Sequence, residues 1–333
     1  MHTSHRITLN IITTILILTT LTPTIAKAHP NTLPTDPNFK GIYEFSGHNS
    51  STDATNPALA GTYLGYYWSQ LEPQKGQYNW DLIDQQMQPW IDNGKNVILR
   101  VATAGWTSWD PSSNSGNATP QWVYDLGVSS VTEVDNAILP QYWNPQFLHS
   151  YNDFIQAFAS HYDGNPNVSA IEMGIGTGGE TKVDTRTNNP NLLADWQAIG
   201  YSDPIWWDTI QQIITDYSTS FQHTPLVVMP DASFIGKTHG YGESLVLNYA
   251  VSHNLWLQDN GLAANRTFTT NQWSQVSLIS EQRDPTTKSG DALLDDMTAA
   301  LNLGATYIMV FASDIDISGN QTVLQEVAAL ANT

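Results

Sequence analysis

Short apolar runs recur along this chain, and most of them are separated by enough residues to form a helix. Runs of this length, rich in branched and aromatic residues, are typical of strands buried on both faces. Strand, helix and strand in succession predict parallel pairing through a helical crossover. We expect eight strands, at 41–45, 61–68, 96–101, from 168, and at 225–229, 255–257, 276–281 and 306–311.

Eight such strands with helices between most of them predict a closed (β/α)8 barrel, the TIM barrel, whose functional residues come from the carboxyl ends of the strands. An open doubly wound sheet is the alternative. Apolar residues at helical spacing, with polar starts and glycine ends, predict the helices. They are expected from 81 to just before Gly94, and at about 146–162, 204–221, 243–252, 291–303 and 321–330.

The segment between the third and fourth strands, residues 103–167, is much longer than the other connections. In parallel α/β folds, long insertions lie at the carboxyl ends of the strands, on the face that carries function. We therefore expect a long insertion after the third strand that forms one wall of a cleft.

The N-terminus has the pattern of a secretory signal peptide, so we divide the chain into a signal segment, 1–28, and a single barrel domain, 29–333. Arg6 supplies the positive start, an apolar and threonine-rich run follows, and Ala26-Lys27-Ala28 has the form of a cleavage site. We expect a secreted protein. An uncleaved N-terminal anchor is the alternative, although the apolar run is short for a membrane span.

The chain is strongly acidic. Its formal net charge is −19, and removal of residues 1–28 takes away Arg6 and Lys27 and no acid, which gives −21. This charge repels nucleic acid and anionic lipid. The absence of cysteine excludes thiolate nucleophiles and cysteine-bound metals. Many tryptophans and tyrosines among neutral polar residues suit a carbohydrate partner, whose C–H faces stack on aromatic rings, although most single aromatics are expected in the core.

Two of the apolar runs each lead to a glutamate. The stretch 168–181, Val-Ser-Ala-Ile-Glu-Met-Gly-Ile-Gly-Thr-Gly-Gly-Glu-Thr, passes through four glycines to Glu180. The stretch 276–284, Val-Ser-Leu-Ile-Ser-Glu-Gln-Arg-Asp, ends its strand at Glu281. Because the carboxyl ends of barrel strands lie on one face, we expect these two glutamates to face each other.

On these residues the chain resembles a clan A glycoside hydrolase, a β-galactosidase-like (β/α)8 enzyme. The run Trp68-Ser69-Gln70-Leu71-Glu72-Pro73, with Tyr78-Asn79-Trp80 and Gly94-Lys95-Asn96-Val97 after it, is similar to the phrase that follows the second strand in β-galactosidase-like members. In that clan the acid/base glutamate follows the fourth strand and the nucleophile ends the seventh. The resemblance implies retaining hydrolysis of β-linked sugar without a cofactor, with Glu180 as acid/base and Glu281 as nucleophile.

One position departs from the clan. Most members place an asparagine directly before the acid/base glutamate, and this chain has Gly179 there. Glu180 also lies several residues beyond the expected strand end. Either the loop Gly174–Gly179 returns to the cleft, or Glu172, inside the strand, is the acid/base. A carbohydrate-binding barrel without catalysis is the alternative function that this departure permits.

A retaining hydrolase needs one ionised carboxylate to attack the anomeric carbon and one protonated carboxyl to supply the leaving oxygen, roughly 5–5.5 Å apart. Both roles suit glutamate because its environment moves its pKa. We expect Arg283, and Arg100 from the third strand, to keep Glu281 ionised. Glu180 is expected to have less cationic support and to hold its proton longer.

Further candidates for sugar binding lie near strand ends and in loops. The candidate platforms for a sugar ring are Trp68, Trp106, Trp109 and Trp273, and each is about as apt to be loop packing. The candidates for binding hydroxyl groups are Tyr43, Glu44, Arg100, Asp231, Asp259, Asn260 and Asp314. Most side chains in such positions are ordinary caps or loop hydrogen bonds.

Other chemistries find little support in the residues. The nine histidines form no His-Glu-x-x-His motif and no tight cluster, so we expect no metal. Gly174–Gly179 lacks the Gly-Lys-Ser/Thr ending of a phosphate-binding loop, and Ser277 and Ser280 lack a nucleophile-elbow pattern. The sugar, its linkage, endo or exo attack and the oligomeric state stay open at this stage.

Overall fold

The computed structural model describes residues 39–45, 54–105, 117–132, 137–184, 191–231, 233–237, 239–268, 270–282 and 288–330. The predicted signal segment, 1–28, lies outside these ranges. Within them, no helix is long and apolar enough to cross a membrane.

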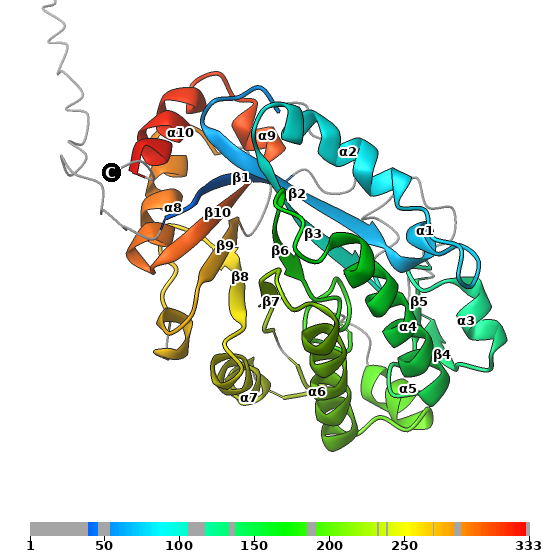
Figure 1. Ribbon diagram of the computed structural model, residues 1–333. Coiled ribbons are helices and arrows are strands. Elements are labelled where there is room, and N and C mark those ends of the chain that lie inside the picture. The colour runs from blue at the N-terminus through cyan, green and yellow to red at the C-terminus, as the bar shows by residue number, and fades with distance from the viewer. Residues whose placement is uncertain are drawn as a thin grey trace, which may run out of the picture. The chain divides into compact units, whose positions relative to one another are not determined.

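The eight predicted strands form one closed barrel (Figure 1). Every neighbouring pair in it is parallel, and the first strand closes against the last. The predicted (β/α)8 barrel is therefore confirmed, and the open doubly wound sheet is wrong. The barrel strands are β1 (Gly41–Phe45), β2 (Leu59–Tyr67), β3 (Asn96–Ala102), β6 (Val168–Glu172), β7 (Leu226–Val228), β8 (Trp256–Leu262), β9 (Leu278–Gln282) and β10 (Ala305–Phe311).

The six predicted helices are present and lie outside the sheet in Figure 1. Local signals mark their starts: the side chain of Asn144 accepts a hydrogen bond from the backbone N–H of Gln146 at 2.9 Å, and Pro145 occupies the first turn. The helices are α2 (Asp81–Asp92), α4 (Pro145–Tyr162), α6 (Asp203–Ser220), α7 (His239–Ser252), α8 (Asp291–Asn302) and α10 (Asn320–Ala329).

Several short elements were not predicted, because segments of three to seven residues carry little periodicity. Between β3 and α4 lie a helix and an antiparallel strand pair, β4 with β5. Residues 106–116 and 133–136 of that segment lie outside the described ranges, so its role as a cleft wall stays a prediction. The short elements are α1 (Trp68–Leu71), α3 (Gln121–Asp125), β4 (Ser130–Thr132), β5 (Ile138–Pro140), α5 (Leu192–Ala198), η1 (Gln272–Ser274) and α9 (Ala312–Ile315).

The interior of the barrel is apolar along most of its length. Its buried side chains are Tyr43, Phe45, Tyr63, Ile98, Ala170, Val227, Ile279, Tyr307 and Met309. Successive side chains of a strand point to opposite faces, so a residue two positions further on shares the inward face. Two positions beyond this apolar filling, toward the carboxyl ends, the inward residues become polar. They are Arg100 on β3, Glu172 on β6, Gln258 on β8 and Glu281 on β9.

Candidate active site

The polar inward residues at the carboxyl end of the barrel are almost completely buried. Glu172 and Gln258 are 0% exposed, Arg100 is 3% exposed and Glu281 is 8% exposed. Unpaired charges in such surroundings are strongly destabilising, so each must be paired or hydrogen-bonded. Two carboxylates and one guanidinium in one layer therefore indicate a site kept for chemistry rather than for packing.

The loop after β6 folds back on itself as a tight hairpin. The backbone N–H of Gly176 donates to the carbonyl of Glu180 at 2.8 Å, and that of Thr177 donates to the carbonyl of Lys182 at 3.0 Å. Gly178 and Gly179 both have positive φ, 68° and 88°. Gly178 N–H also donates to Ala104 O, beyond the end of β3. The glycine run thus returns the chain, and Glu180 with it, to the mouth of the barrel.

Glycine at position 179 has a structural cause. A Cβ there would lie 2.8 Å from Arg100 Cδ and 2.9 Å from Met229 Cε, in a backbone conformation that L side chains rarely adopt. An asparagine before Glu180 would strain this turn and displace Arg100. The departure from the clan pattern is therefore a consequence of how the hairpin packs on the barrel, and it does not separate Glu180 from the site.

Glu180 lies against a lysine and a second acid. Its Oε2 forms an ion pair with Lys182 Nζ, and Lys182 Nζ is also 2.6 Å from Asp231 Oδ2, just after β7. The Glu180 side chain is 12% exposed. The expectation that Glu180 has little cationic support is wrong, because the hairpin brings Lys182, two residues further on, back beside it.

Two side-chain amides of β8 connect Glu180 to Glu281. Gln258 Nε2 donates to Glu281 Oε2 at 2.9 Å and to Asn260 Oδ1 at 2.9 Å. Asn260 Nδ2 donates to Glu180 Oε1 at 2.7 Å. An unbroken hydrogen-bonded path therefore joins the two predicted catalytic glutamates, which the barrel brings together from positions about a hundred residues apart in the chain.

Glu172, the competing acid, lies deeper. Its Oε2 is 3.5 Å from Arg100 Nη1, and neither of its carboxyl oxygens has a hydrogen bond within the described part of the chain. The Arg100 guanidinium also lies 4.8 Å from the centre of the Tyr63 ring. Arg100 is thus held between Tyr63 and Glu172 at the floor of the site.

Burial raises the pKa of all three glutamates. It raises the pKa of Glu281 to about 8, against the lowering effect of Arg100 and with further raising by Glu172, Glu180 and Asp259. It raises the pKa of Glu172 to about 7, again opposed by Arg100. The pKa of Glu180 is also raised by burial, and Lys182 opposes that shift. The free protein therefore holds protons in this cluster at neutral pH.

The expectation that Glu281 stays ionised in the free protein is wrong, because its pKa is raised to about 8. Arg100 lowers the pKa of Glu281, as expected, but burial raises it by more, and Arg100 is also paired with Glu172. Arg283, the other expected support, lies outside the described residues.

These shifts predict a pH-dependent stability. Unfolded glutamates have a pKa near 4.5, so between that value and about 8 the folded protein binds more protons than the unfolded chain. The free energy of unfolding should therefore fall as pH rises through this window, by about 3 kcal/mol for Glu172 alone if its full shift counts. Thermal unfolding at pH 5 and pH 8 measures this difference.

Replacing Glu172 with glutamine should shrink the difference in Tm between pH 5 and pH 8 by several degrees, about 2–4 °C for each kcal/mol removed. Glu326→Gln, on the exposed face of α10, is the matched control and should leave the difference unchanged. An unaltered difference in the Glu172→Gln protein would show that the buried carboxyl does not titrate in this window.

Four of the predicted sugar-binding residues lie in the core and are corrected. Trp68 is 0% exposed, donates from Nε1 to Glu72 Oε2 at 2.8 Å and packs against Tyr151 and Phe154, so neither face of its ring is available. Trp273 is 3% exposed and stacks on Phe268 at 4.6 Å between ring centres.

Tyr43 and Glu44, on β1, do not reach the site either. The Tyr43 hydroxyl lies 2.7 Å from Ser169 Oγ, and its ring belongs to the apolar filling of the barrel. Glu44 lies between two inward residues, Tyr43 and Phe45, so strand alternation directs it toward the helices, and it is 1% exposed.

The remaining predicted residues are near the site or undescribed. Asn260 donates to Glu180, and Asp231 is paired with Lys182, which contacts Glu180 in turn. Asp259 is paired with Arg266, with Oδ2 3.1 Å from Nε. Asp314 accepts from Gln282 Nε2 at 2.9 Å and is fully buried, so it supports the loop after β9. The two further tryptophans, Trp106 and Trp109, lie outside the described residues.

Sequence reasoning missed Gln258 and Lys182. Gln258 is two residues after Trp256, which packs on the barrel filling, so alternation along a correctly extended β8 could have found it. The predicted strand ended at 257. No local signal marks Lys182, because its place depends on the fold of the hairpin.

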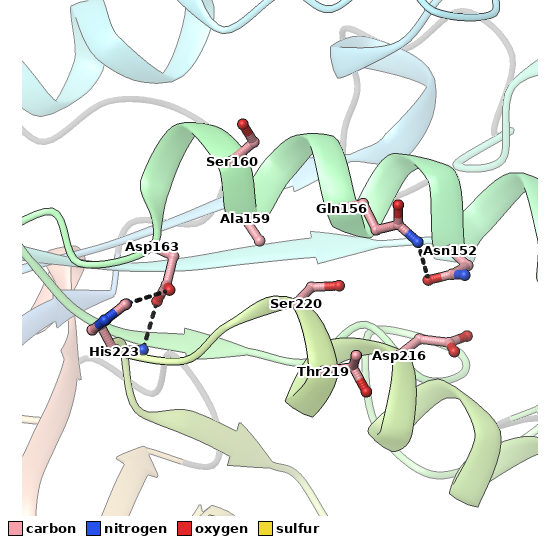
Figure 2. Close-up of a pocket in the computed structure, with 9 residues that line it drawn as sticks. All are labelled: Asn152, Gln156, Ala159, Ser160, Asp163, Asp216, Thr219, Ser220 and His223. Atoms are coloured by element: carbon pink, nitrogen blue, oxygen red, sulfur yellow. Dashed lines mark hydrogen bonds and ion pairs between the residues drawn. The ribbon is translucent and has the colours of Figure 1, made fainter.

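A separate cavity of about 550 Å³ lies between α4 and α6, on the outside of the barrel (Figure 2). Most of the residues that line it are of polar types, among them Asn152, Gln156 and Asp216. His223 Nδ1 lies 2.8 Å from Asp163 Oδ2 at one end. None of the three site glutamates lines it. Among the described residues, no group of three or more His, Cys, Asp or Glu side chains could hold a metal ion.

Comparison with known proteins agrees with this geometry. Residues 62–224, just under half of the chain, match the family model described as β-galactosidase, and this segment contains Arg100, Glu172 and Glu180. The catalytic domain of β-amylase from Paenibacillus polymyxa covers 89% of this chain, which covers 100% of that domain, with a TM-score of 0.61 and 10% identity. At this identity the match speaks for the fold alone. No curated protein sequence matches the chain. The predicted resemblance to a β-galactosidase-like glycoside hydrolase is confirmed.

Proposed function

We propose that this chain, which carries a glycoside hydrolase domain similar to the β-galactosidase family, hydrolyses β-linked oligo- or polysaccharides with retention of anomeric configuration. Glu281 is the nucleophile and Glu180 the general acid and base. The enzyme uses no cofactor. Export by the segment 1–28 belongs to the same proposal, and recovery of the protein in the cell fraction alone would contradict that part.

The observation that carries the proposal is the pairing of Glu281 and Glu180 through the amides of β8, at the carboxyl end of the barrel. The carboxyl ends of barrel strands are where active sites of this fold are built. Glycoside hydrolysis needs two carboxyl groups on either side of one bond, and here two that come from different strands belong to one network.

Accessibility distinguishes the two candidates for the acid. The Glu180 side chain is 12% exposed, whereas Glu172 is fully buried and paired with Arg100. A general acid must come within hydrogen-bond reach of the leaving oxygen. Glu180 meets this requirement better. Glu172 instead sets the electrostatics of the floor, together with Arg100.

The chemistry requires a particular placement of the proton. Attack on the anomeric carbon needs Glu281 ionised, and cleavage needs Glu180 protonated. In the free protein, burial favours the proton on Glu281, and Lys182 favours charge on Glu180. Proton transfer from Glu281 to the Glu180 side of the cluster therefore accompanies substrate binding. After the glycosyl–enzyme intermediate forms, the ionised Glu180 beside Lys182 is ready to act as base toward water.

The test is a screen against chromogenic glycosides and β-linked polysaccharides, followed by proton NMR of the first product formed from the best substrate. We expect cleavage of a β-linked substrate and initial release of the β-anomer. Initial release of the α-anomer would contradict the nucleophile and make Glu281 the base of an inverting enzyme. Binding of glycans without cleavage of any would support the non-catalytic barrel.

A further inference from the structure

Two amide side chains of β8 stand between the proposed nucleophile and the proposed acid. We propose that Gln258 and Asn260 are positioning residues that hold Glu281 and Glu180 in one hydrogen-bonded frame and direct a proton on Glu281 to the carboxyl oxygen that does not face Gln258. This pair is called the amide bridge below. The inference deepens the proposed function and rests on it for the roles of the two acids, although the hydrogen bonds themselves do not depend on any activity.

The strand explains why the two amides meet. Gln258 and Asn260 are two residues apart, so both lie on the inward face of β8. Between Asp259 and Leu262 the register with β9 shifts: Asp259 pairs with Ser280, whereas Leu262 pairs with Gln282. Such an irregularity re-aims side chains at the rim of a barrel. It lets Asn260 reach across to Glu180 while Gln258 stays beside Glu281.

The hydrogen-bond inventory favours one orientation of the Gln258 amide when both acids are ionised. Gln258 Nε2 has two hydrogens, and its two contacts, Glu281 Oε2 and Asn260 Oδ1, are both acceptors. With both acids ionised, reversing the Gln258 amide alone would turn its oxygen toward two acceptors. Gln258 is 0% exposed, so no solvent relieves such a mismatch. The orientation with Nε2 toward both acceptors is therefore the one that fits the ionised acids.

This orientation restricts where protons can sit. Glu281 Oε2 faces the Gln258 donor, so a proton on Glu281 belongs on Oε1. Glu180 faces donors on both oxygens, Asn260 at Oε1 and Lys182 at Oε2. The bridge thus favours ionised forms of both acids and opposes the burial that raises their pKa values.

Charged groups outside the amide bridge act on the same two acids. They oppose or support the effect of the amide bridge on the two acids. They are Arg100 on β3, Glu172 on β6, Lys182 after β6, Asp231 after β7 and Asp259 on β8. Because these groups stay in place when Gln258 is replaced, a change in the titration of Glu281 can be assigned to the loss of its donor.

The first test replaces Gln258 with methionine, which keeps the length and volume of the side chain and removes its donor. We expect the pKa of Glu281 to rise by about one unit, the usual effect of losing a hydrogen bond to a charged group. The ascending limb of kcat/KM against pH should move upward by the same amount. At pH values below this limb, kcat of the variant should be about tenfold lower than that of the unaltered protein, with KM unchanged.

The second variant, Asn260→Leu, removes the donor to Glu180. The descending limb should move to higher pH, by less than the shift in Gln258→Met because Lys182 still contacts Glu180. Gln325→Met on α10 and Asn302→Leu at the end of α8 make the same changes on exposed positions and should alter neither limb.

NMR titration of the glutamate carboxyl ¹³C signals measures the pKa of Glu281 without any substrate. The Glu281→Gln variant assigns the Glu281 signal. An unchanged Glu281 titration in folded Gln258→Met would overturn the bridge, whether or not the protein hydrolyses glycosides. A shifted titration in a protein that cleaves no glycoside would keep the bridge and reject the proposed function. Equal changes in kcat and KM without a shifted limb would indicate packing alone and would also overturn it.

Discussion

Replacing Glu281 with glutamine is expected to lower kcat by at least about 10³-fold, because the variant loses the group that forms the covalent intermediate. Glutamine keeps the shape of the side chain, so the fold and KM should change little. The substitution also removes a buried carboxyl whose pKa is raised to about 8, so the variant should not be less stable at pH 8. Steady-state kinetics on the best chromogenic substrate measure the effect.

The control for this variant is Glu326→Gln, the same chemical change on an exposed position of α10. It should leave kcat and KM within about twofold, as surface substitutions usually do. Hydrolysis by Glu281→Gln at a rate close to that of the unaltered protein would remove Glu281 from the mechanism. The network through Gln258 would then be a structural feature only.

Replacing Glu180 with glutamine is expected to lower kcat by about 10²–10⁴-fold on substrates with poor leaving groups, the usual contribution of a general acid. The loss should be much smaller for aryl glycosides whose leaving group needs no proton. This dependence on the leaving group identifies the acid, because loss of a nucleophile affects all substrates alike. A Brønsted plot of log kcat against the pKa of the leaving group is the measurement.

Glu172→Gln is the contrast that decides between the two candidate acids. Since Glu172 is fully buried and pairs with Arg100, its variant should show the same dependence on leaving group as the unaltered protein. If Glu172→Gln acquires the steep dependence and Glu180→Gln does not, the acid lies inside β6. The proposed role of the hairpin after β6 would then be wrong.

In the proposed mechanism, the placement of Lys182 is a departure from the simplest two-carboxylate scheme. A lysine paired with the proposed acid/base, Glu180, favours its ionised form, which suits the second step, when a base must activate water. The first step needs the same group protonated. We propose that a proton held within the cluster of Glu281, Glu172 and Glu180 reconciles the two requirements, since neighbouring carboxyls that interact strongly titrate as a group.

Much of the fold and half of the site were predictable from the sequence. The eight strands and six long helices follow from local periodicity, which each segment carries within its own residues. Glu281 could be placed because it lies two positions after Ile279 on one apolar strand. The prediction for Trp68 failed for the opposite reason. Trp68 ends the second predicted strand, where functional side chains are expected, but residues of α4 pack against it. No local pattern in the sequence indicates this contact with a helix about 80 residues away.

What the sequence determined by itself is therefore the barrel and the acid at the end of its seventh strand, because hydrophobic period and strand ends are properties of short segments. Only the tertiary structure decided which side chains surround that acid. The return of Glu180 by a glycine hairpin, the lysine beside it and the amide bridge from β8 all depend on contacts between distant residues and on which face of a strand is turned inward. The burial and the pKa of each site glutamate follow from those contacts, so the chemistry of the site depends on the tertiary structure.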